Sequence, residues 1–565
     1  MTTDLLFKIG SIVLLLGGLI FVHELGHFLV AKALNVKVVR FSVGFGPRLF
    51  GFTVGETEYR VAALPLGGYV KMAGDDPSAV PSPEDQGRGF LEQGPFRRFL
   101  IAVAGPAANL LFPILLYLGI GLLQNGKPVP GPVVGTISPG SPAAVAGLRP
   151  GDRILTVTGP GGRAHAIRWF GDLREAVSPH PEEPLRFEVE RDGRRLPAFT
   201  VTPAAEKESN PVETTTRGVI GVMPSYPPAL VAPAAPGAAG PVEPFDLVVQ
   251  AAGKPVRHLG DLDRVLAAAA CAPIDLQVLR EGPAAKPAEG AARPATAGAA
   301  WEPRSLAAVP TCAGAGPSLV SADPTLSAFV AQVLPGSPAE AAGLRRGDDI
   351  LAVNGKPVRS FRDLNAHAAD FKAGKPVALS LAGGRTVSLV PVEQQVRDEA
   401  TGETTRRLAL GFLPASRGPV KPADLLADQV ALRLPFDELL ATSVGHLWDV
   451  TRLTVLGIGR ILTGDISFKT VGGPIMLFSI AAQAAEEGVE SFLFKMALIS
   501  VNLGLMNLVP IPVLDGGHIA ACAVEAVTRR RLSVRAREIA NLVGLALLLL
   551  LMIAVFKNDI ARLMG

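Results

Sequence analysis

Four long stretches of apolar residues constrain this chain more than any other feature of its sequence. They run from about Ile9 to Leu34, Phe99 to Leu123, Phe492 to Val509 and Ile539 to Phe556. Each holds roughly 18 or more mostly apolar residues, which is the length that a helix needs to cross a bilayer. Because backbone polar groups in lipid must be paired within the segment, helices are the expected form. The sequence therefore predicts a polytopic α-helical membrane protein with four transmembrane helices.

Composition agrees with membrane spans and argues against other classes. Only 19% of the residues are charged and the net charge is +3, which is too small for a nucleic-acid-binding footprint, so we expect no nucleic-acid partner. Three cysteines cannot make a disulfide framework. The first apolar stretch lacks a basic leader region and a clear small-residue cleavage site, so we interpret it as a retained helix rather than a signal peptide.

Basic residues near the ends of the spans predict the orientation. The segment between spans one and two holds nine lysines and arginines from Lys32 to Arg98, and the link between spans three and four holds five arginines from Arg529 to Arg537. Segments rich in Lys and Arg stay on the cytoplasmic side. Four spans then place both termini and the long region from about 125 to 440 outside. We therefore expect a multi-pass inner-membrane protein with a periplasmic middle region.

Three stretches of the middle region resemble one another. They are Ile137–Gly159, Val231–Val256 and Val333–Val358, and the second aligns with the third without a gap. Such repeats mean copies of one small domain, and the motif in the first and last copies resembles that of bacterial PDZ domains. PDZ domains bind an extended peptide, usually a C-terminus, at a sheet edge. The middle copy lacks Ser-Pro and Gly-Asp residues, so we expect it to keep the fold with a weak or absent peptide site; the alternative is that all three are spacers.

Two cysteines and two low-complexity stretches fall around the middle copy. Gly282 to Ala300 is rich in Ala, Gly and Pro and is predicted to be a flexible insertion, and Glu206 to Thr215 is interpreted as a linker. Cys271 follows the predicted helix of the middle copy and Cys312 follows its last strand. Bridging them would close a loop of about 40 residues and add roughly 3–4 kcal/mol. The alternative is a pair of ordinary thiols.

The motif His23-Glu24-Leu25-Gly26-His27 lies inside the first apolar stretch. Residues four apart share one face of a helix, so both imidazoles can bind one ion. Glu24 is then within reach of a zinc-bound water and can act as general base. Ionisable groups about 20 Å into a bilayer are expensive and functional by default. The alternative is a pair of structural histidines bonded to neighbouring helices.

A catalytic zinc needs a third protein ligand and an open position for water. The candidate segment follows span three and reads from Asn507 to His518, with Pro510 and Pro512 ending the helix. The pair Gly516-Gly517 allows a tight turn that presents Asp515, and a carboxylate buried there needs a partner such as zinc. His518 could compete as the ligand, and spacing alone does not choose between them.

Three motifs in order carry a family resemblance. HELGH in the first span, GPAAN at Gly105 to Asn109 in the second and NLVPIPVLDGG after the third look like the site-2 protease family of intramembrane zinc metalloproteases. PLGGYVKM at Pro65 to Met72, the PDZ copies and GGPI at Gly472 to Ile475 resemble its bacterial RseP type. The resemblance implies one Zn²⁺ held by His23, His27 and Asp515, Glu24 as catalytic base, and Asn507 binding the unwound substrate. The extra PDZ copy departs from the usual two.

Further segments fit that picture. Lys37 to Met72 alternates four β-like runs with Gly and Pro turns, which predicts a small membrane-associated hairpin sheet whose edge could bind an unwound substrate; the alternative is a solvated loop. His446 to Leu462 is amphipathic and predicts an interfacial helix. The full domain plan is 1–36 first span with HELGH, 37–96 hairpin, 97–124 second span, 125–205 PDZ, 216–311 degenerate PDZ-like, 325–415 PDZ, 416–490 interfacial and 491–565 third and fourth spans with LDGG.

The expected activity is regulated intramembrane proteolysis. The resemblance implies hydrolysis of peptide bonds in or near substrate transmembrane helices, after a first cut outside, with the active site toward the cytoplasm. It implies as substrates transmembrane proteins such as anti-sigma factors and signal-peptide remnants, with membrane lipid as a partner. Two alternatives are an inactive membrane scaffold that binds peptide C-termini through its PDZ domains and a metal transporter. A PDZ-bearing serine protease is set aside because the sequence has no G-x-S-x-G motif.

Overall fold

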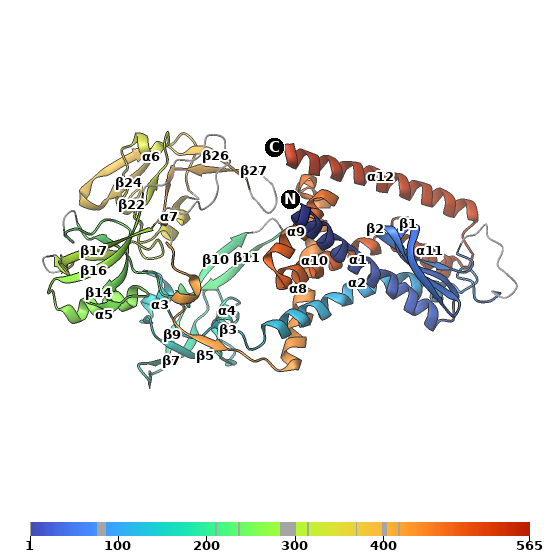
Figure 1. Ribbon diagram of the computed structural model, residues 1–565, viewed down its shortest axis with the longest axis horizontal. Coiled ribbons are helices and arrows are strands. Elements are labelled where there is room, and N and C mark those ends of the chain that lie inside the picture. Colours follow the sequence, from blue (N-terminus) through green and yellow to red (C-terminus); the bar gives the residue numbers. More distant parts are fainter. Residues whose placement is uncertain are drawn as a thin grey trace. The chain divides into compact units, whose positions relative to one another are not determined.

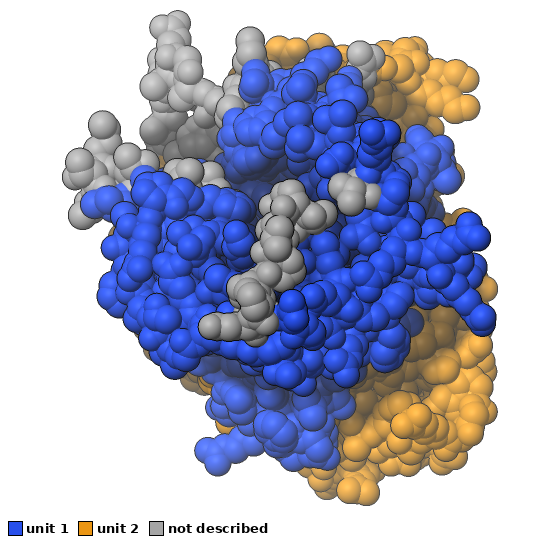
Figure 2. Space-filling view, turned by 90° about the vertical axis from the view of Figure 1, so that its right-hand side faces the viewer, with its two compact units in different colours: residues 1–126, 210–213, 433–565 blue, residues 127–209, 214–432 orange. Residues whose placement is uncertain are grey.

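The chain forms two compact units in the computed structural model (Figure 1). The membrane unit holds residues 1–126, 210–213 and 433–565, and the repeat unit holds residues 127–209 and 214–432; Figure 2 colours them blue and orange. The structure describes residues 2–75, 86–209, 212–235, 238–282, 301–313, 316–368, 370–397, 404–415 and 418–564. Most of the low-complexity stretch 282–300 therefore lies outside the described residues.

Seven helices make up the described helical part of the membrane unit. They are α1 (Thr2–Ala33), α2 (Pro95–Gln124), α8 (Phe436–Thr463), α9 (Pro474–Glu487), α10 (Val489–Leu508), α11 (Asp515–Thr528) and α12 (Val534–Met564), with the short 3-10 helix η4 (Phe468–Thr470) before α9. Four segments are long and apolar enough to cross a membrane, namely Leu6–Ala33, Pro95–Gln124, Val489–Leu508 and Arg535–Arg562. The four apolar stretches are therefore confirmed as helices of spanning length.

The core of the membrane unit lies where α1, α2, α9 and α10 meet. Leu15 and Leu19 of α1 are buried against Leu116 of α2, Ala481 of α9 and Met496 of α10. The amphipathic α8, expected from His446 to Leu462, begins ten residues earlier and packs on α2 and α10. A helix that the sequence analysis did not single out, α9, thus completes the packing around the two central helices.

The predicted hairpin sheet is present as two long bent strands, β1 (Val38–Val54) and β2 (Thr57–Met72), which lie beside α1 (Figure 1). Residues 38–43 pair with 68–72, and within this row 40–43 also pair with 58–61, while 48–54 pair with 57–62. The four runs expected from the sequence therefore form four adjacent rows, with 48–54 and 68–72 at the edges. The apolar face packs on α1, where Phe28 contacts Phe41 and Tyr59 edge to face.

The GGPI motif starts α9, and a carboxylate from α12 caps it. The buried Asp559 accepts hydrogen bonds from the backbone N–H groups of Gly473 at 2.9 Å and Ile475 at 3.0 Å. A Cβ on Gly473 would lie 2.5 Å from the Asp559 Oδ2 atom. Glycine is therefore required at this position, because the last turns of the chain approach the start of α9 closely.

The repeat unit contains three modules of the same plan. In each, a first strand pairs with a closing strand from the far end of the module, and a longer strand pairs with a strand that follows a helix. The first module has strands β4 (Thr136–Ile137), β5 (Arg153–Thr158), β6 (Ala164–Ala166), β7 (Leu185–Arg191), β8 (Arg194–Arg195), β9 (Phe199–Val201), β10 (Ala204–Ser209), β11 (Thr214–Val219) and β12 (Val222–Met223), with helices α3 (Pro142–Val145) and α4 (Phe170–Val177).

The middle and last modules repeat this order. The middle module has β13 (Leu230–Pro233), β14 (Asp246–Ala251), β15 (Lys254–Pro255), α5 (Leu259–Ala269), β16 (Ile274–Glu281), β17 (Trp301–Val309), β18 (Cys312–Ala313), β19 (Gly316–Pro317) and β20 (Leu319–Ser321). The last module has β21 (Gln332–Val333), α6 (Pro338–Ala341), β22 (Ile350–Val353), β23 (Lys356–Pro357), α7 (Phe361–Ala368), β24 (Val377–Leu381), η2 (Ala382–Gly384), β25 (Thr386–Leu389), β26 (Val392–Arg397), β27 (Thr404–Ala409) and β28 (Phe412–Leu413).

The observed module boundaries differ from the expected ones. The stretch 206–215, interpreted as a linker, carries parts of the paired strands β10 and β11. The closing strand β12 pairs with β4 of the first module, so that module continues past 205 to Met223. The middle module starts near Leu230 instead of 216 and closes with β20 beyond 311, because β20 pairs with β13. Closing strands are paired across a whole module, so local sequence similarity does not reveal them.

In the middle module, the segment between the first strand and the turn before the next long strand is three residues shorter than in the last module. The gapless alignment therefore does not hold over this segment. The backbone N–H of Gly347 in the last module bonds to Val330, whereas the equivalent N–H of Phe245 bonds to Val231. Phe245 therefore occupies the turn position of Gly347, with φ of +73° against +89°. The turn is kept in the middle module, although a non-glycine residue is disfavoured at positive φ.

Phe245 is stabilised by the contact between the middle and last modules. Its ring packs edge to face on Phe329 and lies 4.7 Å from the guanidinium of Arg346. Arg346 also pairs with Glu281 at 3.1 Å. Burial of a large aromatic side chain contributes about 2–3 kcal/mol, which exceeds the cost of about 1–2 kcal/mol for the strained backbone. Phe245, which stands where the last module has a glycine, therefore joins the middle and last modules.

Each module keeps a carboxylate paired with an arginine, and this carboxylate is buried in the first and middle modules. Asp152 pairs with Arg191 at 2.6 Å in the first module, and Asp246 pairs with Arg280 at 2.7 Å in the middle module. Asp348 pairs with Arg385 in the last module. The aspartate of the Gly-Asp step is thus present in the middle copy as Asp246, and only its glycine is replaced.

Cys271 and Cys312 form a disulfide in the middle module, with their Cα atoms 5.1 Å apart. The bridge joins the turn after α5 to β18, two points that the register of the repeat allows to approach. The interpretation as two ordinary thiols is therefore wrong. A segment that returns from the last module, with η3 (Pro422–Leu425) and β29 (Gln429–Ala431), pairs with β3 (Pro128–Pro130) and so joins the two ends of the repeat unit.

Candidate metal centre

Two helices and the loop before α11 bring three ligand side chains together. His23 and His27 lie one turn apart on α1 and are both buried. Asp515 is the first residue of α11, where a carboxylate interacts favourably with the helix dipole. Each residue offers one ligand atom, and these three atoms lie within 4.8 Å of one another. The residues proposed from sequence as metal ligands therefore meet in space, although 488 residues separate the second from the third.

The distances among the three ligand atoms suit a tetrahedral zinc site. The Nε2 atom of His23 lies 2.9 Å from one carboxylate oxygen of Asp515, and the Nε2 atom of His27 lies 3.4 Å from the other. The two Nε2 atoms are 3.2 Å apart. Ligands bound to zinc at about 2.0–2.1 Å in a tetrahedron would be about 3.3 Å from one another. Two imidazoles and one carboxylate form a known catalytic zinc donor set with a fourth position for water.

Two glycines allow α2 to pass directly over the imidazoles. A Cβ on Gly105 of α2 would lie 2.3 Å from the Nε2 atom of His27, and a Cβ on Gly26 of α1 would lie 2.3 Å from the Ala104 carbonyl oxygen. Both distances are shorter than any real contact. The helices α1 and α2 can therefore meet at the candidate ligands only with glycine at these positions. This close approach explains the glycine at the start of the GPAAN motif.

The Pro-rich segment after α10 folds back on α11. α10 ends at Leu508, and residues 509–514 are non-helical before Asp515. A Cβ on Gly516 would lie 2.1 Å from the Val509 carbonyl oxygen, and one on Gly517 would lie 2.6 Å from that of Ile511. The predicted turn at the Gly-Gly pair is wrong: both glycines lie in the first turn of α11, where the missing side chains let the helix pack on the backbone before it.

A pocket of about 910 Å³ opens beside the three ligands. Glu24 lies on its wall, and the backbone of Val70 in the edge row 68–72 hydrogen-bonds to the Glu24 carboxylate. Tyr69, Val70 and Met72 of the same row line the pocket. The structure therefore places the candidate base, the candidate ligands and an edge of the hairpin sheet around one cavity.

His518 and Asn507 have different positions from the ligands. His518 lies one turn after Asp515 and lines the pocket, but the cluster of possible metal ligands found among the described residues consists of His23, His27 and Asp515. This geometry favours Asp515 over His518 as the candidate third ligand, a choice that spacing left open. Asn507 lies in the last turn of α10 and is half-buried, outside the set of described residues that line the pocket.

A buried ion network ties α2, α11 and α12 together at the far end of the pocket. Glu525 of α11 pairs with Arg98 of α2 and, at 2.5 Å, with Arg537 of α12. The backbone N–H of Leu532 also donates a hydrogen bond to the Glu525 carboxylate at 3.1 Å. Burial raises the pKa of Glu525, but the hydrogen bonds from Arg98, Leu532 and Arg537 hold it below its usual range. Sequence reasoning missed this network, because its members are far apart in the chain.

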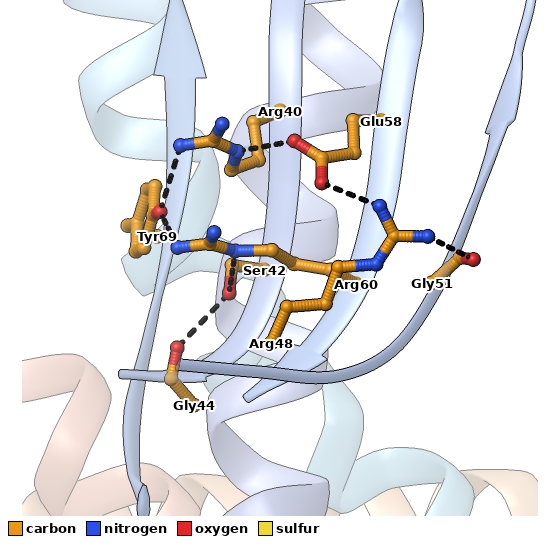
Figure 3. A network of polar contacts seen from close by, with 8 residues as sticks. All are labelled: Arg40, Ser42, Gly44, Arg48, Gly51, Glu58, Arg60 and Tyr69. Atoms are coloured by element: carbon orange, nitrogen blue, oxygen red, sulfur yellow. Dashed lines mark hydrogen bonds and ion pairs between the residues drawn. The ribbon is translucent and has the colours of Figure 1, made fainter. Parts of the chain in front are cut away.

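The polar face of the hairpin sheet carries a network that holds Tyr69 (Figure 3). Arg40 and Arg60 both donate to the Tyr69 hydroxyl, the first at 3.3 Å. Arg40 also pairs with Glu58 at 2.6 Å, which in turn pairs with Arg48 at 3.2 Å. These contacts cross all four rows of the sheet. They therefore stiffen the edge row that lines the pocket.

Comparison with known proteins agrees with this geometry. The chain matches Peptidase family M50 over residues 11–551. A putative zinc metalloprotease of Neisseria meningitidis is 28% identical over 551 residues and 97% of each chain, and one of Ralstonia nicotianae is 30% identical over 563 residues and 96% of each chain. The regulator of sigma-E protease RseP of Escherichia coli is 28% identical over 564 residues and 99% of each chain. These matches span nearly the whole sequence, and the chain belongs to peptidase family M50, the site-2 protease family.

Proposed function

We propose that the protein is an intramembrane zinc endopeptidase that hydrolyses peptide bonds in or next to substrate transmembrane helices. The observation that carries the proposal is the meeting of His23, His27 and Asp515, whose ligand atoms lie within 4.8 Å, inside a unit with four candidate spans. Family membership and the names of the relatives support a peptidase that uses zinc.

The roles of the residues follow from their chemistry. His23, His27 and Asp515 hold the zinc, which when bound supplies Lewis acidity for water activation. Glu24 holds and moves the proton: its carboxylate takes a proton from the attacking water and delivers it to the leaving amine. The N–H of Val70 orients that carboxylate. Asn507, at the end of α10, binds the backbone of the unwound substrate, which is the role that the resemblance of its motif implies.

The edge row 68–72 receives the substrate in an extended form. A peptide bond inside a helix is shielded, so the substrate must unwind before water attacks. An edge strand offers unpaired backbone groups to such a segment, and Tyr69, Val70 and Met72 of this row line the pocket. The contacts that hold Tyr69 keep the row in place during this pairing.

The membrane orientation and the modules complete the proposal. Arginines 529–531, 535 and 537 keep the link between α11 and α12 in the cytoplasm, so the protein is an inner-membrane protein with its active site toward that side. The three modules are PDZ-like domains in the periplasm, and the disulfide in the middle module suits an oxidising compartment. They admit substrates already cut outside, and the sigma-E relatives suggest anti-sigma factors among them.

The decisive experiment pairs metal analysis with cleavage of a model transmembrane substrate. Purified protein should hold about one zinc per chain and cleave the substrate. E24Q should keep the zinc and lose about 10²–10⁴-fold in rate, since general-base catalysis contributes that much. H23A should lose both. Substantial cleavage by E24Q would contradict the mechanism, and a wild-type protein with zinc and no cleavage of any transmembrane substrate would favour the scaffold or transporter interpretations.

A further inference from the structure

The two imidazoles of the metal centre are oriented in different ways. The Nδ1 atom of His27 lies 2.7 Å from the backbone carbonyl oxygen of Ile101. A carbonyl oxygen only accepts, so Nδ1 of His27 carries the ring proton and its Nε2 presents a lone pair. This is the arrangement usual for a metal-binding histidine, whose second nitrogen donates to a fixed acceptor.

His23 has a side-chain amide where His27 has a carbonyl. Its Nδ1 atom lies 3.2 Å from the Nδ2 atom of Asn109 on α2. Asn109 is completely buried, and its Oδ1 atom has no hydrogen-bond partner among the residues that the structure describes. A buried acceptor without a partner costs about 1–3 kcal/mol. The unpaired oxygen therefore requires an explanation.

A histidine that binds a metal through Nε2 must donate its remaining proton from Nδ1. An amide nitrogen cannot accept that proton, but an amide oxygen can. A half-turn about the Cβ–Cγ bond of Asn109 exchanges the two atoms and presents Oδ1 to the imidazole. The buried oxygen without a partner and the ring nitrogen that needs an acceptor thus lie within one side-chain rotation of each other.

We propose that Asn109 is the positioning residue for His23, and that its amide oxygen accepts the Nδ1–H of the imidazole whose Nε2 binds zinc. The amide therefore selects the tautomer of His23 that can be a ligand. It acts through His23 and touches neither substrate nor metal. The inference rests on the proposed zinc site, and it assigns a role to the last residue of the GPAAN motif.

The helix packing holds Asn109 in place for this role. Its backbone carbonyl accepts a hydrogen bond at 2.7 Å from the buried Ser500 hydroxyl of α10. Gly105, one turn earlier on α2, brings the helix backbone against both imidazoles. The side chain at 109 therefore has little freedom except rotation of its amide.

Zinc affinity of the full-length protein in detergent tests the proposal. N109L removes the acceptor while it keeps a similar volume, and should weaken zinc binding about 10–100-fold, the usual cost of losing such a partner. N109D keeps an acceptor and should stay within a few-fold of wild type. S500A is the matched control, since it removes a buried contact to Asn109 without changing the group that faces His23, and should also stay close to wild type.

A second readout reports the tautomer directly. With ¹⁵N-labelled histidine and zinc-loaded protein, NMR should show a hydrogen-bonded Nδ1–H for His23 in wild type and N109D, and a changed signal in N109L. The proposal is overturned if N109L binds zinc as tightly as wild type, or if N109D loses as much affinity as N109L. If instead wild-type protein binds no zinc, or H23A still binds it, the proposed function fails before this inference is reached.

Discussion

Two aspartates, one in each unit, are held by opposite kinds of partner. Asp246 in the middle module has no exposed side-chain surface and accepts two contacts of 2.7 Å from the guanidinium of Arg280. Asp515 at the metal centre has 21% of its side chain exposed, and its ion-pair partners among the described residues are the imidazoles of His23 and His27. Arginine carries a permanent charge, whereas a histidine that binds a metal does so as the neutral imidazole. The first carboxylate is thus neutralised by the chain, and the second leaves a charge for a cation.

The largest effect should come from removing the charge of Asp515. D515N keeps the shape of the side chain and loses the anionic ligand, so bound zinc and cleavage should both fall below detection. Zinc content by elemental analysis and cleavage of a model transmembrane substrate check this. Retention of one zinc per chain by D515N would break the contrast with Asp246, because a neutral side chain would then suffice at the metal centre.

The same substitution at Asp246 should act on stability alone. D246N removes the buried carboxylate that faces Arg280 and leaves it only the exposed Glu243 as a charged partner among the described residues, and breaking a buried pair costs about 3–5 kcal/mol. Hydrogen exchange in β14 and β16 should therefore speed up, while zinc content stays unchanged. D370N is the control, because Asp370 pairs with Lys356 on the surface, and such pairs contribute little. Zinc loss in D246N would show that the two carboxylates are not independent.

The smallest effect is expected for Glu56, a carboxylate at the surface of the membrane unit. Hydrogen bonds from Arg88 and Lys32 lower the pKa of Glu56 to about 2. A lowered folded-state pKa means that its contribution is present above the ordinary value of 4.5 and is lost as pH falls from there toward 2. Hydrogen exchange in the β1–β2 hairpin should accelerate over that range in wild type and much less in E56Q. Equal acceleration in both proteins would exclude Glu56 as the cause.

The sequence was most informative where structure depends on local pattern. Apolar length located the four spans, and alternating runs located the rows of the hairpin sheet, because both follow from residues near one another in the chain. The two candidate histidine ligands could be named because HELGH has a helical spacing. The choice of Asp515 over His518 depended on the family resemblance, and the arrangement around α11 now gives it a physical basis.

What the sequence did not predict depends on distant contacts. The boundaries of the modules are set by closing strands such as β12 and β20, which are paired across a whole module. Phe245 at a glycine position is explained by packing on Phe329 of another module. The Asn109 contact with His23 joins residues 86 apart in the chain. Periodicity cannot show such pairs, since each depends on how whole elements pack.

The disulfide of the middle module turns part of the chain into a covalent ring. Its two cysteines are 41 residues apart in sequence, and the low-complexity stretch 283–300 falls between them. A protease that nicks the chain anywhere in that stretch would leave both halves joined as one molecule. The module can therefore carry a long insertion, because neither its length nor its cleavage separates the strands on either side.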